Sequence, residues 1–233
     1  MPHGASVVRP GSRCPRCEAP LRWRDNIPVL SYLLLRGRCR SCKAGISVRY
    51  PVIELLTALL FLAMTVRFHL SALTVLRDWP FAALMIAITF IDLEHRIIPD
   101  RLNILGAFIG LASAPFVPGF GFLQALLGAL AGFSFFYGLA WLYWRFAKRS
   151  GLGGGDIKFL AMIGLWIGLQ GVIVTVLVSS VLGSVIGIIC ALALKKKAAL
   201  GGHADAKVMQ TAIPYGPFLV IGALYFYLVG DLI

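Results

Sequence analysis

The chain has 233 residues, of which 59% are hydrophobic and 14% charged, and its mean hydropathy is +0.84. This composition excludes an ordinary water-soluble domain and is typical of a membrane protein. The formal net charge of +12 comes from basic residues between and before the apolar runs, ten of the 22 Lys and Arg preceding the first run. We therefore expect anionic lipid headgroups, rather than nucleic acid, as the partner of this charge.

The first fifty residues are the polar part of the chain and contain two CxxC motifs, CPRC and CRSC, separated by 21 residues. Four thiolates, from Cys14, Cys17, Cys39 and Cys42, complete the tetrahedral shell of a structural Zn²⁺ site. The N-terminus has no apolar signal segment, so we expect this module to stay in the reducing cytoplasm, where metal binding is favoured over disulfides. Reduced unligated thiols, or disulfides in an inverted topology, are the alternatives.

From Val52 onward, long apolar runs alternate with short polar or Gly- and Pro-containing breaks. A bilayer core about 30 Å thick needs roughly 20 mostly apolar residues per helical crossing. We predict an all-α polytopic membrane protein with about seven transmembrane helices, at Val52 to Val66, Trp79 to Leu93, Leu102 to Phe116, Phe122 to Tyr143, Ile157 to Gly168, Val172 to Leu194 and Tyr215 to Ile233.

Threading these helices with the N-terminus inside gives basic inside loops and nearly uncharged outside loops, which is the positive-inside pattern. The sequence therefore predicts two domains: a cytoplasmic zinc module over residues 1–50 and a transmembrane domain over residues 51–233. Gly128 with Gly132, and Gly183 with Gly187, have the spacing of small residues that pack helices together. We expect Cys190 to be a small buried hydrophobic residue.

Ionisable residues at membrane segments are costly, so a functional role is the first hypothesis for them. Asp92 ends the second apolar run and Asp156 begins the fifth, and the predicted topology puts both at the cytoplasmic face. Two adjacent carboxylates share one proton, so one can act as a general base on water while the other protonates a substrate carbonyl. Asp100 is expected to cap the third helix, and Glu54 to face the dipole of the first.

Three glycines, Gly153, Gly154 and Gly155, directly precede Asp156. Glycine adopts backbone conformations that other residues avoid and leaves space beside the chain, so we expect an extended peptide substrate to lie here. Taken alone, Asp156 could equally be a helix N-cap, and Asp92 a helix-end acid paired with Arg96.

The ordered segments RWRDNIPVLSYLLLRGRCRSC, SVRYPVIELL, FIDLEHRIIPDRLN, GLGGGDIKFLAMIGLW and IPYGPFLVIGA resemble the bacterial type IV prepilin peptidases, polytopic aspartic proteases of the GxGD type. The resemblance runs from about Ser12 to Gly222. It implies removal of the leader peptide from type IV prepilins or type II secretion pseudopilins, with Asp92 and Asp156 catalytic and the four cysteines in a zinc module.

The resemblance further implies methylation of the new N-terminus with S-adenosylmethionine, and a location in the bacterial inner membrane. No Gly-rich cofactor motif is present, so the sequence does not place the methyl donor. Typical members carry another transmembrane helix before the cysteine module. This sequence departs from that pattern, because only a short polar stretch with VVRP stands before its first cysteine. The alternative function is a zinc-stabilised membrane transporter or scaffold whose acids line an ion path.

Overall fold

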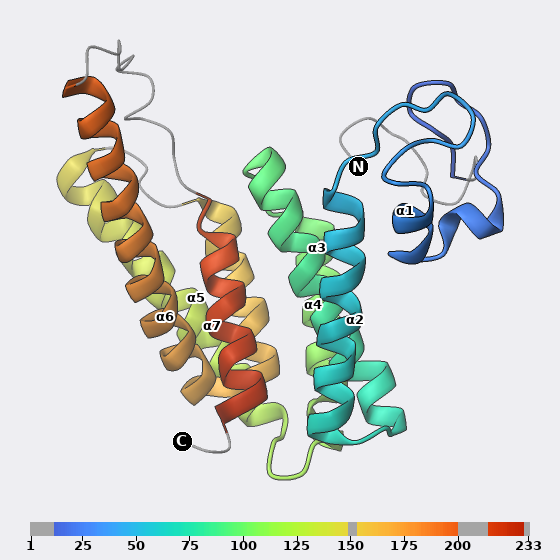
Figure 1. The fold of residues 1–233 in the computed structure, drawn as a ribbon. Coiled ribbons are helices and arrows are strands. Elements are labelled where there is room, and N and C mark those ends of the chain that lie inside the picture. Colours follow the sequence, from blue (N-terminus) through green and yellow to red (C-terminus); the bar gives the residue numbers. More distant parts are fainter. Residues whose placement is uncertain (1–11, 149–152, 200–213, 231–233) are drawn as a thin grey trace. The chain divides into compact units, whose positions relative to one another are not determined.

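The computed structural model describes residues 12–148, 153–199 and 214–230, and only the backbone over 194–199. Within these ranges the regular elements are helices, apart from two isolated β-bridges, which confirms the all-α prediction. The chain divides into two compact units, residues 1–62 and 63–233 (Figure 1). Helix α2 (Arg49–Phe68) runs through the boundary between them.

The first unit contains little regular structure besides the beginning of α2. A 3₁₀ turn, η1 (Trp23–Asn26), and a short helix, α1 (Leu30–Leu34), connect the two cysteine motifs. Val29 precedes α1 with φ 60°, a strained conformation for a β-branched residue, and its N–H donates to Glu54 Oε2 at 2.7 Å. Glu54 thus secures this turn by a side-chain hydrogen bond.

The second unit is a bundle of the helices that follow α2. Along the described residues of both units, helices occur at all seven predicted positions. Their bounds are α2 (Arg49–Phe68), α3 (Trp79–His95) with a preceding π-helical turn η2 (Thr74–Asp78), α4 (Asp100–Ser113) with η3 (Ala114–Phe116), α5 (Phe122–Ala147), α6 (Gly154–Ala199) and α7 (Gly216–Val229). Helix α6 covers two predicted helices because they join across a break at Gly168. The predicted end of the last helix, Ile233, lies outside the described residues.

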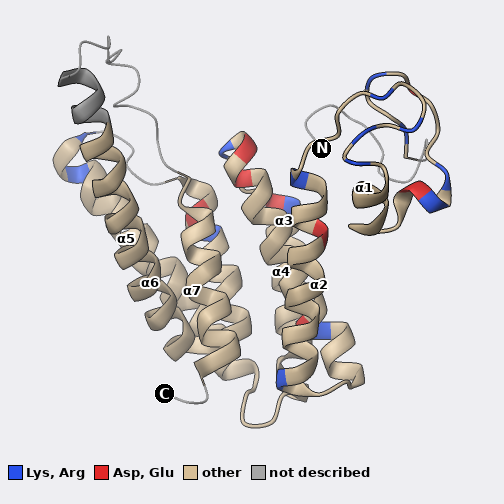
Figure 2. Ribbon diagram, in the orientation of Figure 1, with Lys and Arg blue, Asp and Glu red and all other residues tan. Residues whose placement is uncertain are grey.

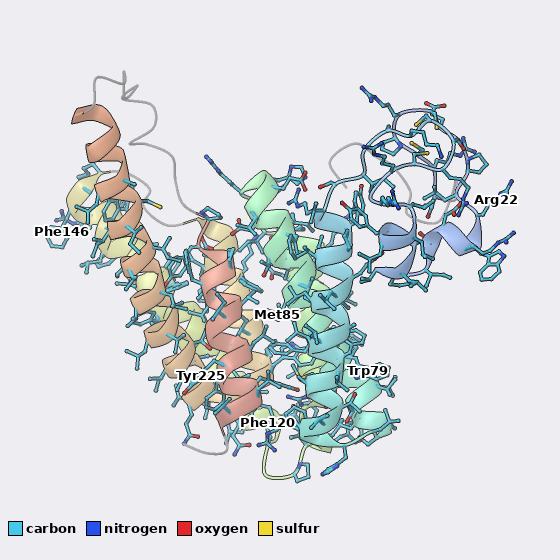
Figure 3. The ribbon with its side chains drawn as sticks, viewed as in Figure 1. Arg22, Trp79, Met85, Phe120, Phe146 and Tyr225 are labelled. Carbon is cyan, nitrogen blue, oxygen red and sulfur yellow. The ribbon has the colours of Figure 1, made fainter. Side chains whose placement is uncertain are left out.

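Four helical segments are long and apolar enough to span a membrane: Arg49–Phe68, Thr74–His95, Phe122–Ala147 and Gly154–Ala193. Large apolar side chains lie on their outer faces, as Phe146 does, whereas Met85 of α3 is fully buried (Figure 3). The charged residues of this unit gather at helix ends (Figure 2). The protein is therefore a multi-pass membrane protein. Cys190 is exposed on α6, so the prediction that it is buried is wrong.

Glycines bring α5 and the first half of α6 into backbone contact. A Cβ atom on Gly164 would collide with the backbone of Gly128, and one on Gly132 would lie 2.7 Å from the Leu160 carbonyl oxygen. The predicted packing role of Gly128 and Gly132 is therefore confirmed. On the second half of α6, a Cβ on Gly183 would lie 3.4 Å from the Tyr215 ring, but a Cβ on Gly187 would have no described atom within 4 Å.

Gly168 interrupts α6 with φ 67° and ψ −171°, so regular helical hydrogen bonding cannot continue across it. Arg77 from η2 meets this break: its Nη2 donates to the Trp166 carbonyl at 2.8 Å. The guanidinium also lies over the rings of Phe120 and Trp166, at 5.6 and 5.4 Å from their centroids. A cation at the end of the first half of α6 complements the negative end of that helix.

The same arginine belongs to a buried polar cluster with Asp78 and Tyr227. Arg77 Nε donates to Tyr227 Oη at 3.2 Å, and that hydroxyl donates to Asp78 Oδ1 at 2.6 Å. Arg77 and Asp78 are 3% and 5% exposed, so each charge depends on the other for compensation. The cluster ties η2, α6 and α7 together at one end of the bundle.

We predict that Arg77→Met destabilises the bundle by about 3–5 kcal/mol, because it leaves Asp78 buried without its counter-charge and the Trp166 carbonyl without its donor. Thermal and denaturant unfolding in detergent would measure the loss. The exposed Arg101→Met variant is the control and should unfold like the parent protein. Equal stability of the two variants would contradict the bridging role of Arg77.

We also predict that Gly164→Ala disrupts the contact between α5 and α6, because the atoms in the way belong to the Gly128 backbone and cannot rotate aside. Gly187→Ala adds the same methyl group where no described atom lies within 4 Å, and it should not lower the melting temperature. A melting temperature for Gly164→Ala equal to that of Gly187→Ala would exclude the close approach.

Candidate active site and metal centre

Asp92 lies near the C-terminal end of α3 and is 5% exposed. The helix ends one turn later, where Arg96 adopts a left-handed conformation and its N–H returns to the Asp92 carbonyl at 2.8 Å. The side chain points to another helix: Asp92 Oδ2 accepts a 2.9 Å hydrogen bond from the backbone N–H of Gly216. The carboxylate therefore lies at the N-terminus of α7, which carries positive partial charge.

Asp156 is the third residue of α6, so it lies within the first turn and not at the N-cap. Its carboxylate accepts a hydrogen bond from the Gly153 backbone N–H, and its own N–H donates to the Gly153 carbonyl at 3.1 Å. This is the acidic half of a capping box. Asp156 thus has a capping contact, which does not use both of its oxygens and leaves it able to interact elsewhere.

The start of α6 lies against the connection between α3 and α4. A Cβ on Gly155 would lie 3.2 Å from Ile98 Cβ, and Lys158 Nζ forms a 2.8 Å ion pair with Asp100 Oδ1. Further along α4 and α6, a Cβ on Gly106 of α4 would lie 2.8 Å from the sulfur of Met162 on α6. This packing brings Asp156 within electrostatic range of Asp92.

The three glycines before Asp156 do not adopt the left-handed conformations expected of them, since none is among the described residues with positive φ. Instead they permit close approach. Gly153 leaves room for the Asp156 carboxylate, whose Oδ2 would lie 2.9 Å from a Cβ there, and Gly155 packs on Ile98. A Cβ on Gly154 would have no atom of the described residues within 4 Å.

Two polar residues near this site were not predicted correctly from the sequence: Asp100 has another role than the predicted one, and Asn103 was not identified. Asp100 makes no side-chain cap to α4, because its carboxylate pairs with Lys158. Asn103, one turn into α4, is 5% exposed, and both polar atoms of its amide lack a hydrogen-bond partner within the described part of the chain. A polar residue inside an amphipathic run was the available signal for Asn103.

The four N-terminal cysteines converge in the first unit. Their Sγ atoms all lie within 4.8 Å of one another, and Cys14 Sγ is 3.9 Å from Cys42 Sγ. Tetrahedral Zn²⁺ with bonds of about 2.3 Å sets sulfur atoms about 3.8 Å apart. The cluster can therefore hold a metal ion of this kind with small adjustments.

Both cysteine motifs have the same backbone geometry. In the first, Cys14 N–H donates to the Ala19 carbonyl and Glu18 N–H returns to Cys14; in the second, Cys39 N–H donates to Ala44 and Lys43 N–H returns to Cys39. Each turn closes on a left-handed residue, Glu18 with φ 55° or Lys43 with φ 57°. The two turns thus present two thiols each, with one buried and one exposed.

The pKa values of two neighbouring thiols, Cys14 and Cys17, shift in opposite directions. The backbone N–H groups of Arg16 and Cys17 lower the pKa of Cys14 to about 6. The Ala19 N–H lowers the pKa of Cys17, but the nearby Cys42 thiol and burial outweigh it and raise that pKa to about 11. One thiolate forms readily and further ones repel it, so a divalent cation is needed for all four to ionise.

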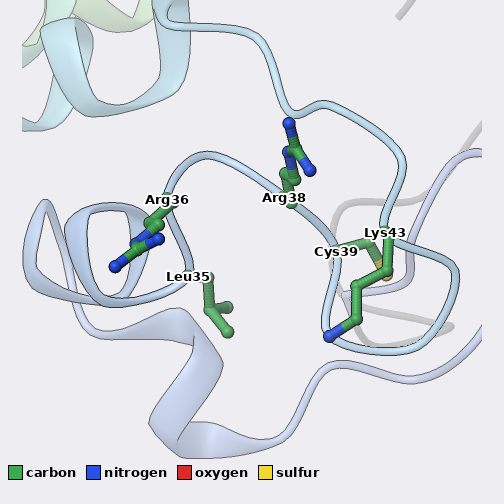
Figure 4. Close-up of a pocket in the computed structure, with 5 residues that line it drawn as sticks. All are labelled: Leu35, Arg36, Arg38, Cys39 and Lys43. Atoms are coloured by element: carbon green, nitrogen blue, oxygen red, sulfur yellow. The ribbon is translucent and has the colours of Figure 1, made fainter.

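Two pockets border the cysteines in the first unit. One, of about 340 Å³, is lined by Leu35, Arg36, Arg38, Cys39 and Lys43, and its basic lining suits an anionic group (Figure 4). The other, of about 710 Å³, includes Tyr32, Tyr50 and Glu54 in its lining and falls in the size range of small-molecule sites. Nearby, Arg40 donates to Asp25 through Nε and Nη2 and lowers the pKa of that carboxyl.

Comparisons with known proteins agree with the division of the chain into two units, residues 1–62 and 63–233. Residues 1–68 match the bacterial peptidase A24 N-terminal domain, and residues 79–188 match the type IV leader peptidase family. Three similar proteins, each named prepilin leader peptidase/N-methyltransferase, come from Aeromonas hydrophila, Myxococcus xanthus and Pseudomonas aeruginosa, with 38%, 40% and 37% identity. The matches cover 97%, 83% and 97% of this chain, and 74%, 57% and 74% of the respective relatives. No solved structure matches the chain.

We predict that Cys17→Ser combined with Cys42→Ser removes bound metal and unfolds the first unit, because a unit with so little apolar core relies on its metal for folding energy. Metal content by mass spectrometry and limited proteolysis of residues 12–48 would report both effects. Cys190→Ser is the matched control and should keep the metal content of the parent protein. Full metal occupancy in the double variant would exclude the four-cysteine site.

Proposed function

The chain belongs to the type IV leader peptidase family, and on that premise we propose that Asp92 and Asp156 are its catalytic carboxylates. The main support is their convergence: 63 residues separate them, yet the packing of α3, α4 and α6 brings them within electrostatic range. Both lie at helix ends, which we propose meet the membrane surface. These positions and the family matches do not favour the transporter or scaffold alternative.

In the proposed reaction one carboxylate is ionised and the other protonated. The ionised carboxylate takes a proton from water as the water oxygen bonds to the scissile carbonyl carbon, while the other carboxyl protonates the carbonyl oxygen. The tetrahedral intermediate then collapses and the carbon–nitrogen bond breaks: the amine nitrogen takes up the proton that the first carboxylate removed from water, and a hydroxyl of the intermediate returns a proton to the second carboxylate. Among the described residues no atom lies within 4 Å of a Cβ on Gly154, which supports our proposal that residues Gly153, Gly154 and Gly155 border the extended substrate.

We propose a type IV prepilin or type II secretion pseudopilin as the substrate, cleaved between its leader peptide and its apolar helix. The names of the relatives support this substrate class, and they also support methylation of the new N-terminus by S-adenosylmethionine. We further propose bacterial inner-membrane insertion, with a cytoplasmic zinc module over residues 1–50 and the peptidase domain over residues 51–233. Zn²⁺ bound by the four cysteines would shape the module without taking part in peptide hydrolysis.

We expect Asp92→Asn and Asp156→Asn each to lower prepilin cleavage by several orders of magnitude, since each removes one of the two proton-transfer groups. Mass spectrometry of a prepilin incubated with the purified protein in lipid would detect the released leader. Adding S-adenosylmethionine should then add one methyl mass to the cleaved product.

Glu94→Gln is the control, because Glu94 is an acid at the same end of α3 whose side chain is 52% exposed. It should cleave like the parent protein. Cleavage that survives either aspartate substitution would refute the proposed pair, whereas a metal-loaded parent protein that never cuts the prepilin would refute the peptidase function for this chain.

A further inference from the structure

We propose that the backbone N–H of Gly216, at the start of α7, is the group that positions Asp92 for catalysis; this inference rests on the proposed function. A donor 124 residues away in sequence contacts the carboxylate directly, at 2.9 Å between Gly216 N and Asp92 Oδ2. Both partners are buried, so water does not compete for the bond. α7 thereby becomes part of the active site without supplying a catalytic side chain.

The sequence around Gly216 leaves this N–H free to serve the carboxylate. The first N–H groups of a helix have no intrahelical acceptor, and Gly216 is the first residue of α7. Pro217 follows and has no N–H, so it offers no competing donor at the adjacent position. The positive end of the α7 dipole adds to the attraction for an ionised Asp92.

The start of α7 is itself held in place by Tyr215. The Tyr215 hydroxyl is 3.0 Å from Ser179 Oγ on α6, and its ring packs 5.9 Å from that of Phe136 on α5. The Tyr215 carbonyl accepts from the Phe218 and Leu219 N–H groups, which begins the helix. The donor to Asp92 is therefore anchored on two other helices and can hold one carboxylate orientation.

Only glycine fits at position 216. A Cβ there would lie 2.6 Å from Asp92 Oδ2 and 3.2 Å from Cγ, so any side chain would push the carboxyl group away. With Oδ2 fixed by Gly216, Oδ1 is the oxygen that remains for water and substrate. Asp156, at the start of α6, is in electrostatic range of Asp92, and α7 carries no charged side chain over its described length.

The test is steady-state cleavage of a prepilin by the full-length Gly216→Ala variant in lipid. We expect kcat to fall about 100-fold, the loss that a misplacement of about 1 Å produces, while KM stays within about twofold because substrate contacts are not removed. Gly187→Ala is the matched control, since it adds a methyl group to another apolar helix where no atom of the described residues lies within 4 Å. A kcat for Gly216→Ala equal to that of Gly187→Ala would overturn the proposal.

A double-variant cycle in melting temperature separates positioning from general destabilisation. Gly216→Ala should lower the melting temperature of the parent protein but not that of Asp92→Ala, because Asp92→Ala removes the two atoms nearest the added methyl group. If Gly216→Ala does not fold by itself, recovery of the fold in the double variant supports the contact. An equal loss of stability in both backgrounds would overturn the proposal.

These measurements also separate this inference from the proposed function. The melting-temperature cycle reports the contact between Gly216 and Asp92 even if the parent protein cleaves no prepilin. If the parent protein cleaves no prepilin but Gly216→Ala lowers the melting temperature only when Asp92 is present, the peptidase function is refuted and the contact between Gly216 and Asp92 is supported. Normal cleavage together with an uncoupled cycle would refute the role of Gly216 alone.

Discussion

The packing of the bundle depends on the hydrogen bond that Arg77 donates to the Trp166 carbonyl at the break in α6. A buried backbone carbonyl has no water to bond with, so an interrupted helix needs a donor from the protein. Arg77 supplies it to Trp166 and is in turn balanced by Asp78 and Tyr227. The first half of α6 is therefore held at one end by this cluster, and along its length by backbone contact with α5.

The other end of that half-helix carries Asp156, ten residues or about 15 Å from Trp166. Because the half-helix is fixed along its length, the position of Asp156 is set by packing far from the carboxylate. Asp92 is fixed differently, by the N-terminus of α7. Each carboxylate thus lies at a positive helix end, which offsets part of the cost of placing two acids close together in an apolar bundle.

The first unit is stabilised differently, because it has few buried apolar side chains among its described residues. Two turns of identical hydrogen bonding aim four thiols at one point, and strained residues at Glu18 and Lys43 close those turns. A metal ion can supply the cohesion that a small segment lacks. Glu54 adds a fixed hydrogen bond at Val29, so this acid has a structural task where the sequence predicted a helix-dipole role.

Hydropathy and motif spacing were enough to predict the helices, the cysteine cluster and the two acids at helix ends. Hydropathy and CxxC spacing are local properties, so they hold whatever the helices pack against. The contacts of individual side chains depend instead on how the helices pack: Asp100 pairs with Lys158 instead of capping α4, Cys190 is exposed, and Gly216 contacts Asp92. An apolar residue suits lipid and protein equally, so hydropathy cannot show which face of a helix packs inward, and contacts across 124 residues leave no local pattern.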